Sequence, residues 1–196
     1  APPIADGERE ARLAAIAPVL RGLLAERGEG GETKKRFVLD FRGGPEIDAF
    51  MAAEGAAALA ETGPLTSDHV IRTKAWPVFI GDLPFGDAPA TRQVLTGAVG
   101  AFRAKYDAYF EQNAEAKGVT KTKLDASPRV VLVRGLGALA WGATKKDARI
   151  AGDITEHTLE TKAIAAGLGA YRSLSDADLF DMEYWSLEQA KLGKGA

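Results

Sequence analysis

The segment Thr66–Lys74 holds the side chains whose types and spacing best suit anion binding. It follows a Gly-Pro stop, precedes a predicted strand and contains His69, Arg72 and Lys74. If the segment is helical, His69, Arg72 and Thr73 share a face, whereas an extended segment places Arg72 and Lys74 on one face. Either geometry offers cations to a phosphate or carboxylate, which makes His69, Arg72 and Lys74 the candidate catalytic or substrate-binding residues. The alternative is a solvated segment whose charges form surface ion pairs.

The sequence holds two histidines, His69 and His157, and no cysteine. A catalytic zinc usually takes two or three imidazoles and a carboxylate, so a zinc site within this chain would need nearly every histidine. His157 follows Ile154 by three residues and Ile150 by seven, which favours a partly buried structural histidine on a helix. The lack of cysteine excludes thiol nucleophiles, disulfides and iron–sulfur ligands, and agrees with a reducing compartment such as the cytoplasm.

One stretch imitates a dinucleotide-binding fingerprint. The apolar run Arg129–Val133 is followed by Gly135-x-Gly137-x-x-Ala140, and glycines in such a motif let a helix N-terminus approach a pyrophosphate. The helix must then begin at the glycines, but the start signal lies later, in the capping box Thr144–Asp147. The acidic residue expected about twenty residues further on also falls inside a predicted helix. We therefore predict a tight glycine turn between two strands and no cofactor bound by this segment.

Periodicity and turn residues predict alternating helices and strands. Apolar residues at three- and four-residue steps indicate helices, and short β-branched or aromatic runs indicate strands. The predicted helices are Asp6–Arg27 capped by Asp6, Pro45–Glu61, Arg92–Glu115, Lys145–Ala166 and one or two closing helices after the capping box Ser175–Asp178; the predicted strands are Phe37–Phe41, Trp76–Ile80, Arg129–Val133 and Ala138–Trp141.

These elements predict an α/β fold of three layers, α/β/α, around a central mixed or antiparallel sheet. The strands Arg129–Val133 and Ala138–Trp141 are separated by only a short glycine turn, which suits an antiparallel hairpin because a parallel pair needs a crossover of about a dozen residues or more. Each long helix has one apolar stripe and is expected to cover one face of the sheet. Burial of both Val131 and Leu132 would show that helices cover both faces.

The composition narrows the classes of protein. The chain has 196 residues, with 25 Lys and Arg against 27 Asp and Glu, and this balance disfavours nucleic acid or an anionic membrane as a partner. Its apolar runs are far shorter than the roughly 20 residues of a membrane span. The chain begins Ala1-Pro2-Pro3 without Met, which indicates a piece of a longer chain or a processed one. We expect a single cytoplasmic domain.

Three blocks carry a family resemblance: Thr66–Lys74 (TSDHVIRTK), Arg129–Thr158 (RVVLVRGLGALAWGATKKDARIAGDITEHT) and Leu179–Leu192 (LFDMEYWSLEQAKL). They resemble the bifunctional rhamnulose-phosphate aldolase/alcohol dehydrogenases, which have an N-terminal class II aldolase/adducin-like region and a C-terminal short-chain dehydrogenase domain. The resemblance runs in order over nearly the whole chain and places it before the dehydrogenase. It implies an aldolase-like domain over residues 1–192 and a linker over residues 193–196.

The resemblance also implies what this domain lacks. Class II aldolases hold zinc with three histidines, and the zinc polarises a ketose-phosphate carbonyl so that a carbon–carbon bond breaks to an enediolate. The third histidine belongs to an Asn-His-Gly turn before a Trp-Gly pair, and registering on Trp141-Gly142 places Leu136 at the histidine position. Leucine cannot bind zinc, and the His-x-His pair of the family has no counterpart in this chain. The resemblance therefore implies no metal ligand in this segment.

Two classes of function remain open. In the first, the chain is an accessory aldolase domain, inactive alone, that supports cleavage of a ketose 1-phosphate such as rhamnulose 1-phosphate. In the second, it is a noncatalytic spacer or oligomerisation domain between the two enzymes; an NAD-binding oxidoreductase domain is a further alternative. The expected partners are the N-terminal aldolase region with zinc, the C-terminal dehydrogenase domain with NAD, a sugar phosphate, and further copies in a homo-oligomer.

Overall fold

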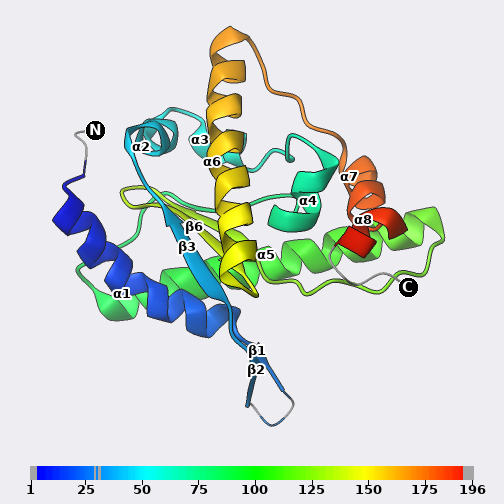
Figure 1. Ribbon diagram of the computed structural model, residues 1–196, viewed down its shortest axis with the longest axis horizontal. Helices are drawn as coiled ribbons and strands as arrows, with labels where there is room; N and C mark the ends of the chain where they lie inside the picture. The colour runs from blue at the N-terminus through cyan, green and yellow to red at the C-terminus, as the bar shows by residue number, and fades with distance from the viewer. Residues whose placement is uncertain (1–3, 29, 31, 192–196) are drawn as a thin grey trace.

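A four-stranded sheet lies between two layers of helices in the computed structural model, which describes residues 4–28, 30 and 32–191 (Figure 1). The strands stand in the order β3 (Val38–Arg42), β6 (Gly137–Gly142), β5 (Val130–Val133) and β4 (Val78–Ile80). Strand β6 pairs antiparallel with both β3 and β5, whereas β4 and β5 are parallel. The sheet is therefore mixed, which confirms the predicted α/β fold class.

The connections explain this pairing. Strands β5 and β6 form the predicted antiparallel hairpin, and its turn is closed by the Leu136 amide, which donates to the Val133 carbonyl at 3.0 Å. The parallel partners β4 and β5 are joined through the long helix α5 (Ala88–Lys117), which supplies the crossover that a parallel pair requires.

Helices cover both faces of the sheet, as predicted. Val131 and Leu132 are both 0% exposed, and since successive residues of a strand point to opposite faces, neither face is open to water at β5. Val131 belongs to a core with the apolar residues of α1 and α5, and Leu132 to a second core with those of α2, α3 and α6. The further helices of these layers are α1 (Asp6–Leu24), α2 (Pro45–Ala52), α3 (Ala56–Ala60) and α6 (Lys145–Leu168).

Shorter elements complete the described chain. Helices α4 (Ser67–Thr73), α7 (Asp176–Glu183) and α8 (Ser186–Lys191) contact one another beside the C-terminal half of α5 (Figure 1). A small antiparallel hairpin, β1 (Glu26–Arg27) and β2 (Thr33–Lys35), extends from the body near the end of α1. None of the described helices is long and apolar enough to cross a membrane.

Two of the predicted capping boxes are confirmed. The Thr144 hydroxyl accepts from the Asp147 amide at 3.1 Å at the start of α6, and the Ser175 hydroxyl accepts from the Asp178 amide at 3.2 Å before α7. The expected Asp6 cap is wrong, because Asp6 is the first residue of α1 and lies after the cap position. In that position its carboxylate still lies near the positive end of the helix dipole.

Several predicted boundaries differ from the observed ones, and strand β4, for example, is Val78–Ile80 and not Trp76–Ile80. Helix α1 ends at Leu24, before Arg27 enters the β1–β2 hairpin. The single helix predicted over 45–61 is two helices, because Ala53 is extended after the end of α2 and Gly55, with φ 73°, is left-handed before the start of α3. Helix α5 begins before the predicted Arg92, because the Asp87 carboxylate accepts from the Ala90 amide at 3.0 Å and caps an earlier first turn.

Candidate functional site

Helix α4 sets the geometry of the predicted anion-binding segment. It realises the helical alternative, and its partly buried His69 lies close enough to His157 of α6 for their charges to interact. Burial lowers the pKa of His69, the nearby His157 lowers it further, and Asp68 raises it. His157 itself is exposed, so the prediction of a partly buried structural histidine at that position is wrong.

The three candidate residues face different neighbours. Arg72 pairs with Asp147 in the first turn of α6, with Nη1 and Oδ1 3.5 Å apart, so it shares the α6 side with His69. Lys74 follows the last residue of α4, and its amine is buried beside Glu183 of α7. The structure therefore brings His69 and Arg72 to one side and Lys74 to another, and a joint role in substrate binding stays a prediction.

Lys74 is part of a buried polar cluster with Glu183, Tyr106 and Tyr184. The Lys74 and Glu183 side chains are 4% and 0% exposed, and Lys74 Nζ lies 3.6 Å from Glu183 Oε1. The amine also lies 3.8 Å from the centroid of the Tyr106 ring, within cation–π range. The Tyr106 hydroxyl donates to Glu183 Oε1 at 2.8 Å and lies 2.7 Å from the Tyr184 hydroxyl.

The electrostatics of this cluster follow from its burial. Burial lowers the pKa of Lys74 to about 8, against the attraction of Glu183, and burial raises the pKa of Glu183, against the attraction of Lys74. Burial also raises the pKa of Tyr184 to about 12, with the Glu183 charge adding to the shift. Lys74 adopts φ 68°, a strained conformation for a residue with a side chain. The cluster holds the end of α4 against α5 and α7.

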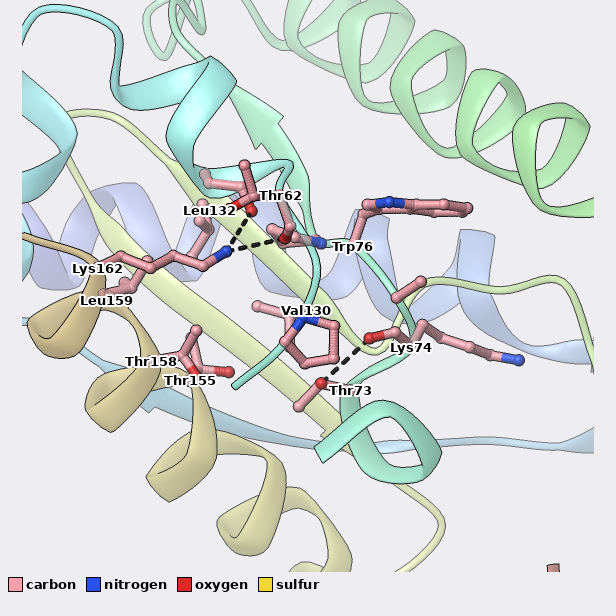
Figure 2. Close-up of a pocket in the computed structure, with 14 residues that line it drawn as sticks. Thr62, Thr73, Lys74, Trp76, Val130, Leu132, Thr155, Thr158, Leu159 and Lys162 are labelled. Atoms are coloured by element: carbon pink, nitrogen blue, oxygen red, sulfur yellow. Dashed lines mark hydrogen bonds between the residues drawn. The ribbon is translucent and has the colours of Figure 1, made fainter. Parts of the chain in front are cut away.

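A pocket opens on the α6 side of the sheet, between the α4–β4 connection and α6 (Figure 2). Figure 2 shows Lys162 reaching from α6 toward the carbonyl of Thr62, while the Lys74 side chain points away from the pocket. The polar side chains that face the pocket are those of threonines and Lys162, and its apolar walls include Val130, Leu132 and Leu159. The Trp76 ring, like the Lys74 side chain, points away from the pocket (Figure 2).

Lys162 is the functional candidate that sequence reasoning missed. Its side chain is 2% exposed, and Nζ donates to the carbonyls of Ala60 at 3.2 Å and Thr62 at 2.9 Å. Burial lowers the pKa of its amine to about 8. The signal was present in the sequence: Thr155 and Leu159 precede Lys162 by seven and three residues, so all three lie on the buried stripe of α6.

The glycine turn between β5 and β6 is enclosed by α1. Leu136 at its centre is 0% exposed and belongs to the core beneath α1 and α5. Arg12 donates to the Gly135 carbonyl and Arg9 donates to the Leu136 carbonyl. Arg9 is itself fixed by Asp48 of α2, with Nη2 and Oδ2 2.6 Å apart. The carbonyls of the turn therefore accept from two arginines of α1, and the Leu136 side chain points into the core.

Comparison with known proteins identifies the family. The family model described as "Aldolase class II, second domain" matches residues 11–192. The chain belongs to this family. Among curated proteins, "Uncharacterized oxidoreductase YuxG" of Bacillus subtilis (strain 168) is 27% identical over 191 residues, which are 97% of this chain and 26% of that protein. This second aldolase domain thus spans about a quarter of the length of the curated relative that it matches.

The residues of the domain do not fit the zinc centre of class II aldolases. By the resemblance the third histidine ligand falls on Leu136, whose side chain is apolar and fully buried. The two histidines of the chain, His69 and His157, belong to helices α4 and α6 and not to the β5–β6 turn. Within residues 4–28, 30 and 32–191, no three His, Asp or Glu side chains are grouped so that they could hold a metal ion.

The glycine motif does not fit a dinucleotide either. It leads into strand β6, and the next helix begins only after the Thr144 cap, so the helix that the fingerprint requires does not begin at the glycines. Gly137 is a glycine for a steric reason, because a Cβ at this position would lie 2.4 Å from the Arg42 carbonyl of β3. Gly135 adopts φ 77°, which a glycine tolerates in a tight turn. Both glycines are explained by the hairpin and its contact with β3.

Proposed function

We propose that this chain is an accessory class II aldolase-like domain of a longer sugar-metabolising enzyme and is not active alone. In this proposal the parent chain cleaves a ketose 1-phosphate, such as rhamnulose 1-phosphate, in an N-terminal zinc-dependent aldolase region. A C-terminal short-chain dehydrogenase domain uses NAD. The observation that supports the proposal most directly is the burial of the apolar Leu136 side chain, at the position that the resemblance assigns to a zinc-binding histidine.

The length and the name of the relative support a composite parent. The matched curated protein is about four times longer than the stretch it shares with this chain, and its name calls it an oxidoreductase. An oxidoreductase activity requires a site that this domain's glycine turn does not provide. The proposal therefore assigns the redox chemistry to the dehydrogenase part and the aldol chemistry to the N-terminal part.

The first experiment tests whether the isolated domain holds a metal. Calorimetric titration of the purified chain with zinc is expected to show no tight site, and no ketose 1-phosphate cleavage should accompany it. The matched variants are His69→Ala and His157→Ala, which remove the two histidines one at a time. Submicromolar zinc affinity that is lost in His69→Ala would overturn the proposal, because it would place a metal centre on α4.

The second experiment separates an accessory domain from a spacer. In the full-length parent enzyme, residues 11–192 are replaced by a flexible linker, and aldol cleavage and alcohol oxidation are measured separately. An accessory role predicts that cleavage is lost while oxidation is retained. Retention of both activities, with a smaller oligomer in sedimentation, would instead establish the spacer alternative. Sequencing the gene on both sides of this segment first determines whether such a parent exists.

The spacer alternative has one specific observation in its favour. The C-terminal end of α6 projects beyond the sheet (Figure 1), and its Ile164 and Leu168 side chains are 58% and 87% exposed. Exposed apolar side chains of this kind are typical of protein contacts. The NAD-binding alternative lacks such support, and a fluorescence titration with NADH is expected to show no saturable change. Saturable binding would restore that alternative.

A further inference from the structure

The pocket beside Lys162 has a charge pattern that the accessory role does not use. Lys162 Nζ is the buried cation of this pocket, and burial is the cause of its lowered pKa, with no carboxylate opposing it. The described residues that line the pocket include no aspartate or glutamate. Buried charges in proteins are normally paired. The buried amine of Lys74 is paired in this way with the Glu183 carboxylate. Among the described residues, the amine of Lys162 contacts only neutral groups, two backbone carbonyls and the Tyr171 ring.

The ammonium group retains one donor for a ligand. Lysine has three N–H donors, and two of them are used by the carbonyls of Ala60 and Thr62. The Tyr171 ring lies 5.2 Å from Nζ and screens the amine on one side. The remaining donor and the positive charge suit an anion, since charge-assisted hydrogen bonds are stronger than those to neutral acceptors.

A second polar group in the pocket is also without a partner. Thr158, one turn before Lys162 on α6, has a buried hydroxyl with no hydrogen bond among the described residues. By contrast, the hydroxyls of Thr155 and Thr73 donate to backbone carbonyls. A buried hydroxyl that lacks a partner is destabilising unless a ligand or water supplies one. Figure 2 places Thr158 on the same helix as Lys162, within the pocket lining.

The size and the walls of the pocket select the ligand. The volume open to the centres of water molecules is about 40 Å³, which is room for about three waters because each needs about 10–15 Å³ on this measure. Phosphorylated sugars are far larger. The walls beside Lys162 are apolar, from Val130, Leu132 and Leu159, so they suit a short hydrocarbon part better than a second charge.

We propose that this pocket binds a monocarboxylate of two or three carbon atoms, with its carboxylate held by Lys162 and Thr158 and its hydrocarbon part against the apolar wall. The ligand supplies the counter-ion that the chain omits. Its carboxylate accepts from the third N–H of Lys162 and from the Thr158 hydroxyl. The site lies apart from the glycine turn, so it is independent of the role proposed for the parent enzyme.

The test uses acetate as the probe and the isolated chain, followed through the methyl NMR resonances of Thr158, Leu132 and Leu159. Acetate is expected to shift these resonances saturably at millimolar concentration, which is the affinity that so small a ligand can reach. Acetamide, its neutral isostere, should bind about tenfold more weakly or not at all, since it lacks the charge. Valerate, which is too long for the pocket, should not compete.

Matched variants assign the contacts. Thr158→Val keeps the shape and removes the hydroxyl, and it should weaken acetate binding about tenfold or more, because a hydrogen bond to a carboxylate is charge-assisted. Lys162→Met should weaken it by tenfold or more, and the exposed Lys146→Met is the control with unchanged binding. The proposal is overturned if acetamide binds as tightly as acetate, or if Thr158→Val leaves the affinity unchanged. These two comparisons remain decisive even where Lys162→Met does not fold.

Discussion

Lys74 and Lys162 are two buried lysines that compensate the desolvation of an ammonium group in different ways. Lys74 has a carboxylate 3.6 Å away and an aromatic ring 3.8 Å away. Lys162 has two backbone carbonyls near the end of α3, where the helix dipole places partial negative charge. Both arrangements leave the pKa of the amine lowered to about 8. Each of the two amines therefore loses its proton at a lower pH in the folded chain than in the unfolded one.

The pH dependence of stability tests the burial of Lys162. Its pKa is lowered from 10.5 to about 8, so between these values the unfolded chain binds more protons and stability rises with pH. Compared with Lys162→Met, the wild type should gain about 1 kcal/mol per pH unit between about pH 8 and pH 10. Urea unfolding of both proteins across this range measures the difference, in which the tyrosine contributions cancel. A difference that is independent of pH would contradict the burial of a charged amine.

The Lys74–Glu183 pair predicts a strong coupling between two substitutions. Glu183→Gln leaves the ammonium of Lys74 buried without an anion, and Lys74→Met leaves the carboxylate without a cation. Each should lower the free energy of unfolding by about 3–5 kcal/mol, as for other broken buried pairs. The double variant should be less destabilised than the sum of the two, because it leaves no isolated charge. Additive effects in urea unfolding would show that the two groups do not interact.

The sequence alone predicts the structural role of a residue where the residues around it in the fold are also its neighbours in the sequence. The tight glycine turn around Leu136 is predicted from the sequence, and the structure shows it as the turn of the β5–β6 hairpin, whereas the replacement of a metal ligand by Leu136 stays a prediction. The partner of Lys74 could not be predicted, because Glu183 is more than a hundred residues away in the sequence and is brought near only by the packing of α7. The same holds for Lys162, whose acceptors Ala60 and Thr62 lie at the end of another helix.

At the scale of elements, two glycine environments predict opposite effects of adding a methyl group. Gly137 has φ 146°, and a Cβ there would lie 2.4 Å from the Arg42 carbonyl and 2.8 Å from the Phe41 ring. Gly137→Ala should therefore push β3 away from β6 and destabilise the fold by about 3 kcal/mol or more. Gly100 in α5 has open space around its Cβ position. Gly100→Ala should stabilise by about 0.5–1 kcal/mol, from helix propensity alone. Thermal unfolding of both variants measures the two signs.

The elements were predictable where one strong local pattern decided them. The hairpin of β5 and β6 followed from a short glycine turn between two apolar runs, and the start of α6 followed from the Thr144 capping box. The break between α2 and α3 is not predicted, because the alanine-rich run on both sides favours a helix and only Gly55 is a residue that often interrupts one. The β1–β2 hairpin was missed as well, since its residues are mostly polar and exposed and give no alternating apolar pattern.

At the scale of the molecule, salt bridges connect the layers at the outer strand of the sheet. Arg42 of β3 pairs with Asp153 at 2.6 Å and with Glu156 at 3.2 Å, both on α6. At the β5–β6 turn, where Arg9 of α1 donates to the Leu136 carbonyl, Arg9 also pairs with Asp48 of α2. The Arg9–Asp48 pair therefore joins two helices that cover opposite faces of the sheet, and the Arg42 pairs join the edge strand β3 to α6.

Hydrogen exchange should distinguish the buried central strand of the sheet from the β1–β2 hairpin. The amides of β5 are expected to exchange slowest, because its four residues are at most 2% exposed and the strand is paired on both sides. Their exchange should require global unfolding, whereas the exposed β1–β2 hairpin should exchange through local opening at much lower free energy. Mass spectrometry or NMR of the exchanged chain measures both regions in one sample. Added denaturant should accelerate β5 exchange with the full m value of global unfolding and leave the β1–β2 rates nearly unchanged. Equal protection of the two regions would mean that the sheet is not the cooperative centre of the fold.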